Sequence, residues 1–364
     1  MSALPARPRL VSLDVFRGLT MAGMVIVNNP GSWDHVYWPL LHAEWHGWTP
    51  TDLIFPFFLF IVGVAITLSR KTESWDRILR RTTIIFALGL LLNWYPRFDL
   101  STWRIPGVLQ RIAICYLAAA AAYRMTRGDR GRQGRQLAFL AAALALVYWI
   151  VMAFVPAPGS AAGDLTPEGN LGAWIDRSLM PGHLWRPRWD PEGLLSTVPA
   201  ISTALLGVVA GLWLSSGEAP RRKVAGLALA GAAGVVLAYT WHAVFPINKN
   251  LWTSSYVALT AGLAALALAA CYWIVDVRNH RAWTAPFVIL GSNAITLYVL
   301  SGLLADTLGV VGVRGLPLGA WIHTRLFEPL ASPKTASLLY ALAHLVILFI
   351  PLAWMHRRRI FLKV

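Results

Sequence analysis

The chain is poor in charged residues and in cysteine. Only 13% of its 364 residues are charged, whereas a soluble domain usually carries about 25%. Together with an apolar fraction of 57%, this scarcity excludes a disordered chain, a collagen-like chain and an ordinary water-soluble enzyme. Both cysteines, Cys115 and Cys271, lie inside apolar runs, so neither a disulfide framework nor a thiolate metal site is expected.

Long apolar runs are abundant. A helix needs about 20 such residues to cross roughly 30 Å of hydrocarbon, and continuous rather than alternating runs favour helices over a barrel. We predict an all-α polytopic helix bundle, one transmembrane domain over residues 1–364 with about ten spans. The spans are expected at 10–29, 49–69, 82–97, 106–123, 136–156, 193–215, 224–245, 252–275, 284–304 and 335–355.

The remaining charge is strongly basic, with 32 Lys and Arg against 17 Asp and Glu. In a soluble protein this surplus would suggest a nucleic-acid partner. If the N-terminus is cytoplasmic and the chain alternates sides, 21 basic residues fall in cytoplasmic segments, 9 in outer segments and two, Arg17 and Arg111, within spans. This asymmetry predicts cytoplasmic N- and C-termini. The charge then requires no nucleic acid.

The outer loops are expected to be long, at residues 30–48, 157–192 and 305–334. The middle loop contains Trp174 and Trp185, which favours recognition of a ligand on that side. The alternative is that such tryptophans anchor the protein at the membrane interface. The first span carries Asp14 and Arg17 and has no small-residue cleavage site, so we do not expect a removable signal peptide.

Polar residues within spans are functional candidates because burying a charge in lipid is unfavourable. Asp14 and Arg17 are three residues apart, so they could form a structural ion pair or serve a ligand. Arg111 has no acidic neighbour in sequence and needs either a partner in the bundle or an anionic ligand. Asn293 likewise needs a hydrogen-bonding partner.

The densest polar cluster surrounds the first outer loop and includes Asn28, His42, His46 and Asp52. The spacing of His42 and His46 could suit zinc, but the segment lacks a third ligand and the metalloprotease pattern, so no metal is expected. Proton transfer is the more economical chemistry, with His42 as base, Asp52 orienting it and Asn28 holding an oxyanion. Placement of His42 at a polar interface remains an alternative.

Two further clusters lie on the outer side. Asp190 and Glu192 precede the sixth predicted span, where they could bind an amino sugar or cap the helix N-terminus. Asn248 and Asn250 belong to a polar turn before the eighth predicted span.

Ordered motifs along nearly the whole chain resemble the heparan-α-glucosaminide N-acetyltransferase family of membrane acyltransferases. The motifs are Ser12-Leu-Asp-Val-Phe-Arg-Gly18, Val27-Asn28, His42-Ala-x-Trp-x-Gly-x-Thr-x-x-Asp-Leu-x-Phe-Pro56, Arg104-Ile-Pro-Gly-Val-Leu-Gln-Arg111, Asp190-Pro-Glu-Gly193, Pro246-Ile-Asn-Lys-Asn-Leu-Trp252 and the Lys-containing C-terminal tail.

The resemblance implies transfer of an acetyl group from cytoplasmic acetyl-CoA to the amine of a glucosamine on the opposite side. It implies catalytic roles for His42 and Asn28, with Asp52 orienting the site. The expected sugar contacts are Asp190, Glu192, Arg111, Asn248 and Asn250, and the expected CoA contacts are Arg17, Asp14 and Asn293. The expected partners are acetyl-CoA, an amino-sugar acceptor, the lipid bilayer and, as an alternative to a monomer, a second copy of the chain.

Alternatives remain open for both mechanism and function. His42 could act as a general base in direct transfer, which we favour because one tunnel would hold both substrates, or it could carry the acetyl group itself. A glycan O-acyltransferase and an amino-sugar transporter or flippase are the rival functions. The transporter should show repeated halves, and the sequence contains no such symmetry.

Overall fold

The computed structural model describes residues 10–69, 74–126 and 128–362, and this part of the chain is all-α apart from one ribbon of two short strands. The α-helices are α1 (Val11–Asn28), α2 (Ile54–Leu68), α3 (Trp75–Trp94), α4 (Val108–Met125), α5 (Arg130–Phe154), α6 (Leu171–Leu179), α7 (Leu194–Leu214), α8 (Pro220–His242), α9 (Ser254–Cys271), α10 (Ala285–Ser292), α11 (Ala294–Val310), α12 (Leu318–Ile322) and α13 (Pro333–Arg357). The strands are β1 (Gly312–Val313) and β2 (Leu316–Pro317), which pair antiparallel.

Every predicted span coincides with a helix or with two consecutive helices. Among the described residues, seven helices are long and apolar enough to cross a membrane, or eight if the bent pair α10 and α11 is one span. The helices α3 and α4 are outside this set because charged residues interrupt them, including Arg77 in α3 and Arg111 in α4. The fold is thus a polytopic helical one, and the total of ten spans remains a prediction.

The run predicted as one span over 284–304 is instead broken at Asn293. The axes of α10 and α11 differ there by 80°. Asn293 is buried, donates to the Ile360 carbonyl at 3.1 Å and accepts from the Leu362 amide at 3.0 Å. The partner that this residue needs is therefore the backbone of the segment that follows α13.

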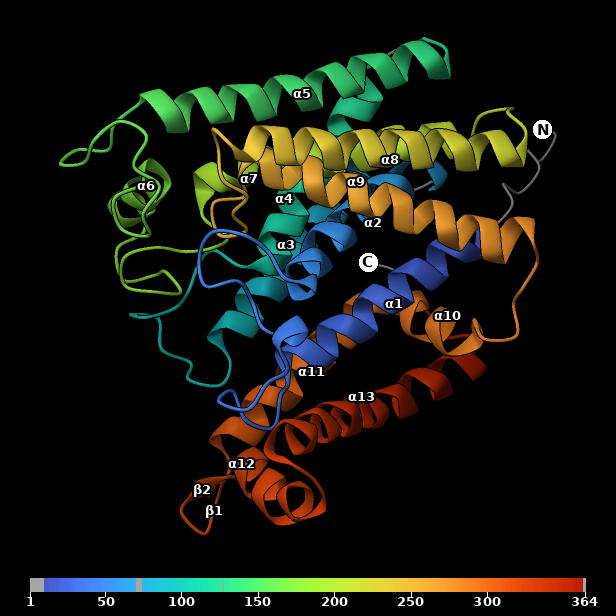
Figure 1. The fold of residues 1–364 in the computed structure, drawn as a ribbon. Coiled ribbons are helices and arrows are strands. Elements are labelled where there is room, and N and C mark those ends of the chain that lie inside the picture. The colour runs from blue at the N-terminus through green and yellow to red at the C-terminus, as the bar shows by residue number, and fades with distance from the viewer. Residues whose placement is uncertain (1–9, 70–73, 127, 363–364) are drawn as a thin grey trace.

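The long helices lie in layers, with α5 outermost beyond α7, α8 and α9, and with α1, α10, α11 and α13 on the opposite side (Figure 1). Small residues allow close packing between these layers. A Cβ added at Gly207 of α7 would come within 2.1 Å of the Phe60 carbonyl oxygen on α2, so only glycine permits this approach.

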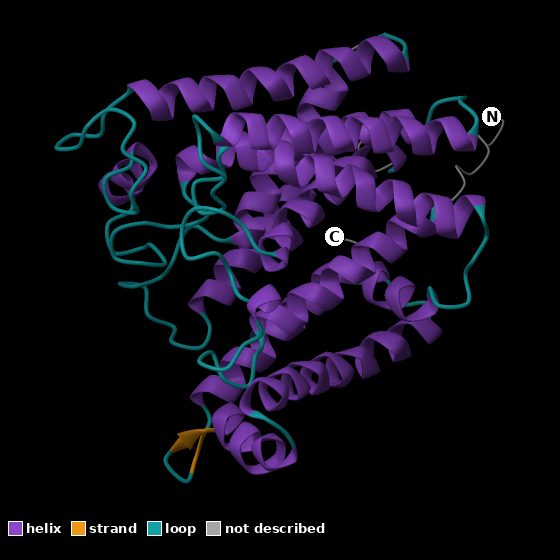
Figure 2. Ribbon diagram, viewed as in Figure 1, coloured by secondary structure: helices purple, strands orange, loops and turns teal. Residues whose placement is uncertain are grey.

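The connections at one end of the bundle interlock (Figure 2). The Gly47 amide donates to the Ile247 carbonyl at 2.7 Å, and the Trp45 indole donates to the Leu165 carbonyl at 2.8 Å. At the opposite end, Arg130 contacts the Ser215 carbonyl and links the α4–α5 turn to the α7–α8 turn.

Two of the predicted outer loops are more ordered than expected. The loop 157–192 contains the amphipathic helix α6, whose N-terminus is capped by the Asn170 side chain at 2.8 Å from the Ala173 amide. The segment 305–334 is not a continuous loop, because α11 extends to Val310 and is followed by β1, β2 and α12. Helices as short as α6 and α12 contain no apolar run of membrane-spanning length, so the hydropathy pattern does not predict them.

Candidate active site

A helix cap at the start of α2 positions His42. Asp52 Oδ2 accepts from the Thr49 amide at 3.0 Å, which is one half of the capping box of the 3-10 turn Pro50–Leu53 that leads into α2. The same oxygen also accepts from the Ala43 amide at 3.0 Å. The other oxygen, Oδ1, lies 2.7 Å from His42 Nδ1. One buried carboxylate therefore both caps the helix and fixes the imidazole, and Nε2 is the ring nitrogen that Asp52 does not contact.

Lys249 completes this cluster from the loop between α8 and α9. Its Nζ lies 3.4 Å from Asp52 Oδ1, 2.9 Å from His42 Nδ1 and 3.3 Å from His42 Nε2. The His42 side chain is 44% exposed, whereas that of Asp52 is 1% exposed. Only the imidazole is thus open to a ligand, and burial lowers the pKa of Lys249 from its ordinary value.

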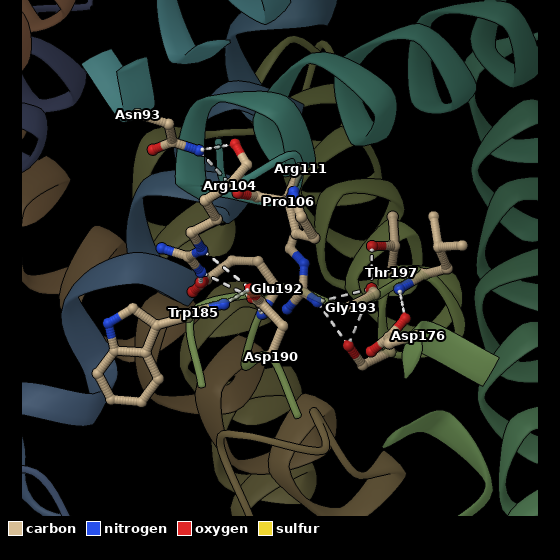
Figure 3. Close-up of polar contacts among 12 residues, drawn as sticks. Asn93, Arg104, Pro106, Arg111, Asp176, Trp185, Asp190, Glu192, Gly193 and Thr197 are labelled. Atoms are coloured by element: carbon tan, nitrogen blue, oxygen red, sulfur yellow. Dashed lines mark hydrogen bonds and ion pairs between the residues drawn. The ribbon is translucent and has the colours of Figure 1, made fainter. Parts of the chain in front are cut away.

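A second cluster centres on Arg104, which binds both predicted sugar-binding carboxylates (Figure 3). The guanidinium contacts Asp190 at 2.9 and 2.7 Å and Glu192 at 2.5 Å. Asp190 also accepts from the Trp185 and Glu192 amides. The two carboxylates are therefore held in a network rather than capping α7 alone, and one Arg against two carboxylates leaves one negative charge in excess.

The turn that enters α7 is tightly enclosed by charged side chains (Figure 3). Asp176 of α6 accepts from the Leu194 amide at 2.9 Å. Burial, reinforced by the neighbouring Asp190, raises the pKa of Asp176 to about 6. A Cβ added at Gly193 would lie 1.9 Å from Asp176 Oδ2, so this carboxylate occupies space that only glycine leaves open.

Arg111 finds its partner within the bundle. It is 1% exposed, donates to the Gly193 carbonyl at 3.1 Å and to the Ser196 hydroxyl at 2.5 Å, and lies 5.1 Å from the Trp252 ring centroid. Arg111 was expected to find either a partner in the bundle or an anionic ligand, and these contacts favour the partner in the bundle. They hold the start of α7 against α4.

The predicted asparagines of the outer turn are divided between two roles. Asn248 is fully buried; its oxygen accepts from the Leu251 amide at 2.9 Å and its amide lies 3.3 Å from His46 Nδ1, so it shapes the turn. Asn250 instead lines a small cavity together with Asp190 and Trp45. Trp189 belongs to the same lining and packs edge-on against Trp45, with ring centroids 5.2 Å apart.

Asn28 stands apart from this cluster. It is exposed at the end of α1, and among the described residues no side-chain hydrogen bond joins it to His42. Its neighbour Asn29 is buried and bonds to the Val25 carbonyl and the Ser301 hydroxyl. The oxyanion role of Asn28 therefore remains a prediction.

The three predicted CoA contacts lie near one another beside the α10–α11 break. Arg17 reaches Asp14 at 3.5 Å and the Gly291 carbonyl at 3.4 Å, two residues before Asn293. A guanidinium held beside a helix break is suited to a phosphate group. Lys363 of the terminal motif lies outside the described residues. Within the described ranges, no three His, Cys, Asp or Glu side chains gather as a metal ion would require.

Three residues of the site were not anticipated individually. Lys249 and Arg104 both lie in motifs shared with the family, Lys249 next to Asn248 and Arg104 at the start of the motif that ends at Arg111. These positions were the only sequence signal for their roles. Asp176 had no signal, because it lies on a short helix within a loop that was expected to be irregular.

Residues 9–236 match the model of the family described as heparan-alpha-glucosaminide N-acetyltransferase, catalytic. The chain is 32% identical over 360 residues to the human heparan-alpha-glucosaminide N-acetyltransferase, covering 82% of this chain and 53% of the human protein. The mouse protein of the same name is 31% identical over 354 residues, covering 80% and 53%. The chain thus spans about half the length of these curated relatives, and it belongs to the heparan-alpha-glucosaminide N-acetyltransferase family, as its motifs indicated.

Proposed function

We propose that the protein transfers an acetyl group from acetyl-CoA to the amine of a glucosamine-type sugar across a membrane. The observation that carries this proposal is the His42–Asp52 pair at the loop-rich end, 2.7 Å apart, with one partner exposed and the other buried. A base whose other ring nitrogen bonds a carboxylate is the arrangement that general base catalysis needs.

The charges around His42 support an amino sugar as the acceptor. Four carboxylates, Asp52, Asp176, Asp190 and Glu192, lie within electrostatic reach of three cations, Arg104, Arg111 and Lys249. With His42 neutral, the cluster carries one excess negative charge, which complements one ammonium group. The side chains of Asn250, Trp45 and Trp189 offer amide and aromatic contacts of the kind that sugars use. They have to move apart to admit a sugar, because the cavity between them is about 10 Å³, which is room for about one water molecule.

The donor is proposed to bind from the opposite end of the bundle. We assign the CoA phosphates to the surroundings of Arg17, Asp14 and Asn293, while the thioester extends toward His42. The gathering of basic residues at the turns linked by Arg130 and Ser215 supports a cytoplasmic position for that end. We place both termini there, in a bacterial inner membrane, and a homodimer stays an alternative to a monomer.

The proposed reaction is direct. The sugar ammonium first loses one proton to solvent, and the neutral amine then attacks the thioester carbonyl. His42 Nε2 takes the second proton from nitrogen, and Asp52 stabilises the imidazolium that forms. Asn28 at the end of α1 is the proposed donor to the oxyanion. We favour this route over an acetylated His42 because holding both substrates in one tunnel supplies the proximity that direct transfer needs.

The test is acetyl transfer by the purified protein in detergent, with radiolabelled acetyl-CoA and a panel of amino sugars. His42→Ala should lower kcat by about 10²- to 10⁴-fold, the usual contribution of a general base. His35→Ala is the matched control, because His35 is an exposed histidine of the same loop and its replacement should leave kcat unchanged.

Several outcomes would contradict the proposal. Absence of transfer above the His42→Ala level for every amino sugar would refute the acetyltransferase. Transfer to sugar hydroxyls with equal efficiency would favour the O-acyltransferase, and sugar transport into proteoliposomes without acetylation would favour the transporter. An acetyl group found on His42 by mass spectrometry after acetyl-CoA alone would replace the direct route with a two-step one.

A further inference from the structure

Lys249 occupies an unusual position beside the imidazole of His42. Its Nζ lies at similar distances, 2.9 and 3.3 Å, from the two ring nitrogens. Because Lys249 Nζ is nearly equidistant from Nδ1 and Nε2, it cannot lie along the lone pair of either nitrogen. The short hydrogen bond of the His42 ring is therefore the one between Nδ1 and Asp52. The contact of Lys249 with His42 is therefore chiefly electrostatic, while its contact with Asp52 Oδ1 is an ion pair at 3.4 Å.

The charged groups around Lys249 set how many protons this cluster holds. Asp52 and His42 face it directly, and Glu192 acts on it through space while being paired with Arg104. On its own loop the neighbouring Asn248 contacts His46. Glu192 acts on Lys249 only from a distance, whereas Asp52 is the carboxylate that both His42 and Lys249 contact directly. In direct contact, Asp52 therefore balances one cation at a time.

We propose that Lys249 is a positioning residue for acetyl transfer, which releases its proton as His42 accepts one from the amine. This inference rests on the proposed function. At rest the ammonium balances Asp52 and disfavours a second cation on His42, so the imidazole remains a neutral base. The side chain of Lys249 is 18% exposed, and its burial lowers its pKa, which eases the release.

The step balances in atoms and protons. The amine nitrogen forms a bond to the acetyl carbon, the carbon–sulfur bond breaks, and its electron pair leaves with the CoA sulfur. One proton passes from the neutral amine to His42 Nε2, Lys249 releases its proton to solvent, and the CoA thiolate takes one proton from solvent. Transfer of the proton from His42 to Lys249 then restores the resting state, so the net movement is one proton from nitrogen to sulfur.

Two substitutions separate proton release from charge alone. Lys249→Met removes the charge, whereas Lys249→Arg keeps it but cannot release a proton, since an arginine in a protein is not deprotonated. We expect both to lower kcat by about 10²-fold, the lower range for acid–base groups, with the KM for acetyl-CoA unchanged. We also expect the decline of wild-type kcat at alkaline pH to be absent in Lys249→Arg.

The matched control is Lys334→Arg, a change at an exposed lysine at the start of α13, which should retain wild-type kcat. If Lys249→Arg keeps kcat within about threefold of wild type and the alkaline decline persists, charge alone suffices and the proposal is refuted. A role limited to holding the loop would predict loss of thermal stability in both variants without any change in the pH profile.

A second measurement does not depend on acetyl transfer. Diethylpyrocarbonate modifies the neutral imidazole, so mass spectrometry of the His42 peptide follows its protonation. In Lys249→Met the imidazolium of His42 can pair with Asp52 without competition, so the pH of half-maximal modification should rise by about 1 unit. In Lys249→Arg it should stay at the wild-type value. The exposed His35 serves as the reference. No shift would overturn the charge coupling. If the shift occurs but the wild-type protein transfers no acetyl group, the proposed function and the proton step are refuted. The sharing of Asp52 between His42 and Lys249 is then still supported.

Discussion

Replacement of Asp176 by asparagine should abolish a specific pH dependence of stability. In the folded chain, burial raises the pKa of Asp176 from its ordinary 3.8 to about 6. Between those two pH values the native state binds more protons at this site than the unfolded state. The free energy of unfolding therefore falls as pH rises through that window, and the loss is complete above pH 6. A shift of about two units corresponds to about 3 kcal/mol.

The assay is thermal unfolding of the purified protein in detergent, followed by the fluorescence of its 18 tryptophans at several pH values from 4 to 7.5. Asp176→Asn retains an oxygen to accept from the Leu194 amide but cannot ionise. Relative to wild type it should gain up to about 3 kcal/mol between pH 4 and pH 7.5. Glu168→Gln, at an exposed ion pair with Arg188 in the same loop, is the control and should show no such gain. A variant-minus-wild-type difference that is the same at pH 4 and 7.5 would refute the reasoning.

Two further substitutions test the network beside this carboxylate. Arg104→Gln leaves Asp190 and Glu192 without their cation, so we expect a loss of about 3 kcal/mol in unfolding free energy, measured as a lower Tm. This loss should be absent when the Arg104→Gln variant also carries Asp190→Asn and Glu192→Gln. Gly193→Ala places a Cβ 1.9 Å from Asp176 Oδ2 and should destabilise by about 1–3 kcal/mol; the combination with Asp176→Ala should restore Tm, and failure to do so would show that the clash is not the cause.

The helices could be located from the sequence because their apolar stretches are long, and the ends of α1 and α7 were predicted to within one residue, but other ends were not. The run predicted from 136 begins at Arg130 in the structure, and the run predicted from 82 begins at Trp75. A helix does not stop where the hydrocarbon does, because its backbone hydrogen bonds continue through charged residues at no penalty in water. The hydropathy pattern also missed the 80° break at Asn293, since the residues on both sides of it are apolar.

The site divides in the same way between local and distant contacts. His42 and Asp52 are ten residues apart and joined by a helix cap, so their pairing could be inferred from local sequence. Arg104 and Asp190 are 86 residues apart, and His42 and Lys249 are 207 apart. Such pairs meet only after the helices have packed, and one sequence contains no pattern that identifies the partner of a buried charge.

The joining of the first loop to the α8–α9 loop has a consequence for biosynthesis. The Gly47–Ile247 hydrogen bond and the His42–Lys249 contact connect a segment made early with one made only after α8 has followed. Contacts of such long sequence separation form late because closing the intervening loop is entropically unfavourable. A ribosome-bound chain that ends within α8 can therefore already contain the His42–Asp52 cap while it lacks the cation that balances it. On the role we propose for Lys249, acetyl transfer would therefore begin only once the α8–α9 loop has packed against the first loop.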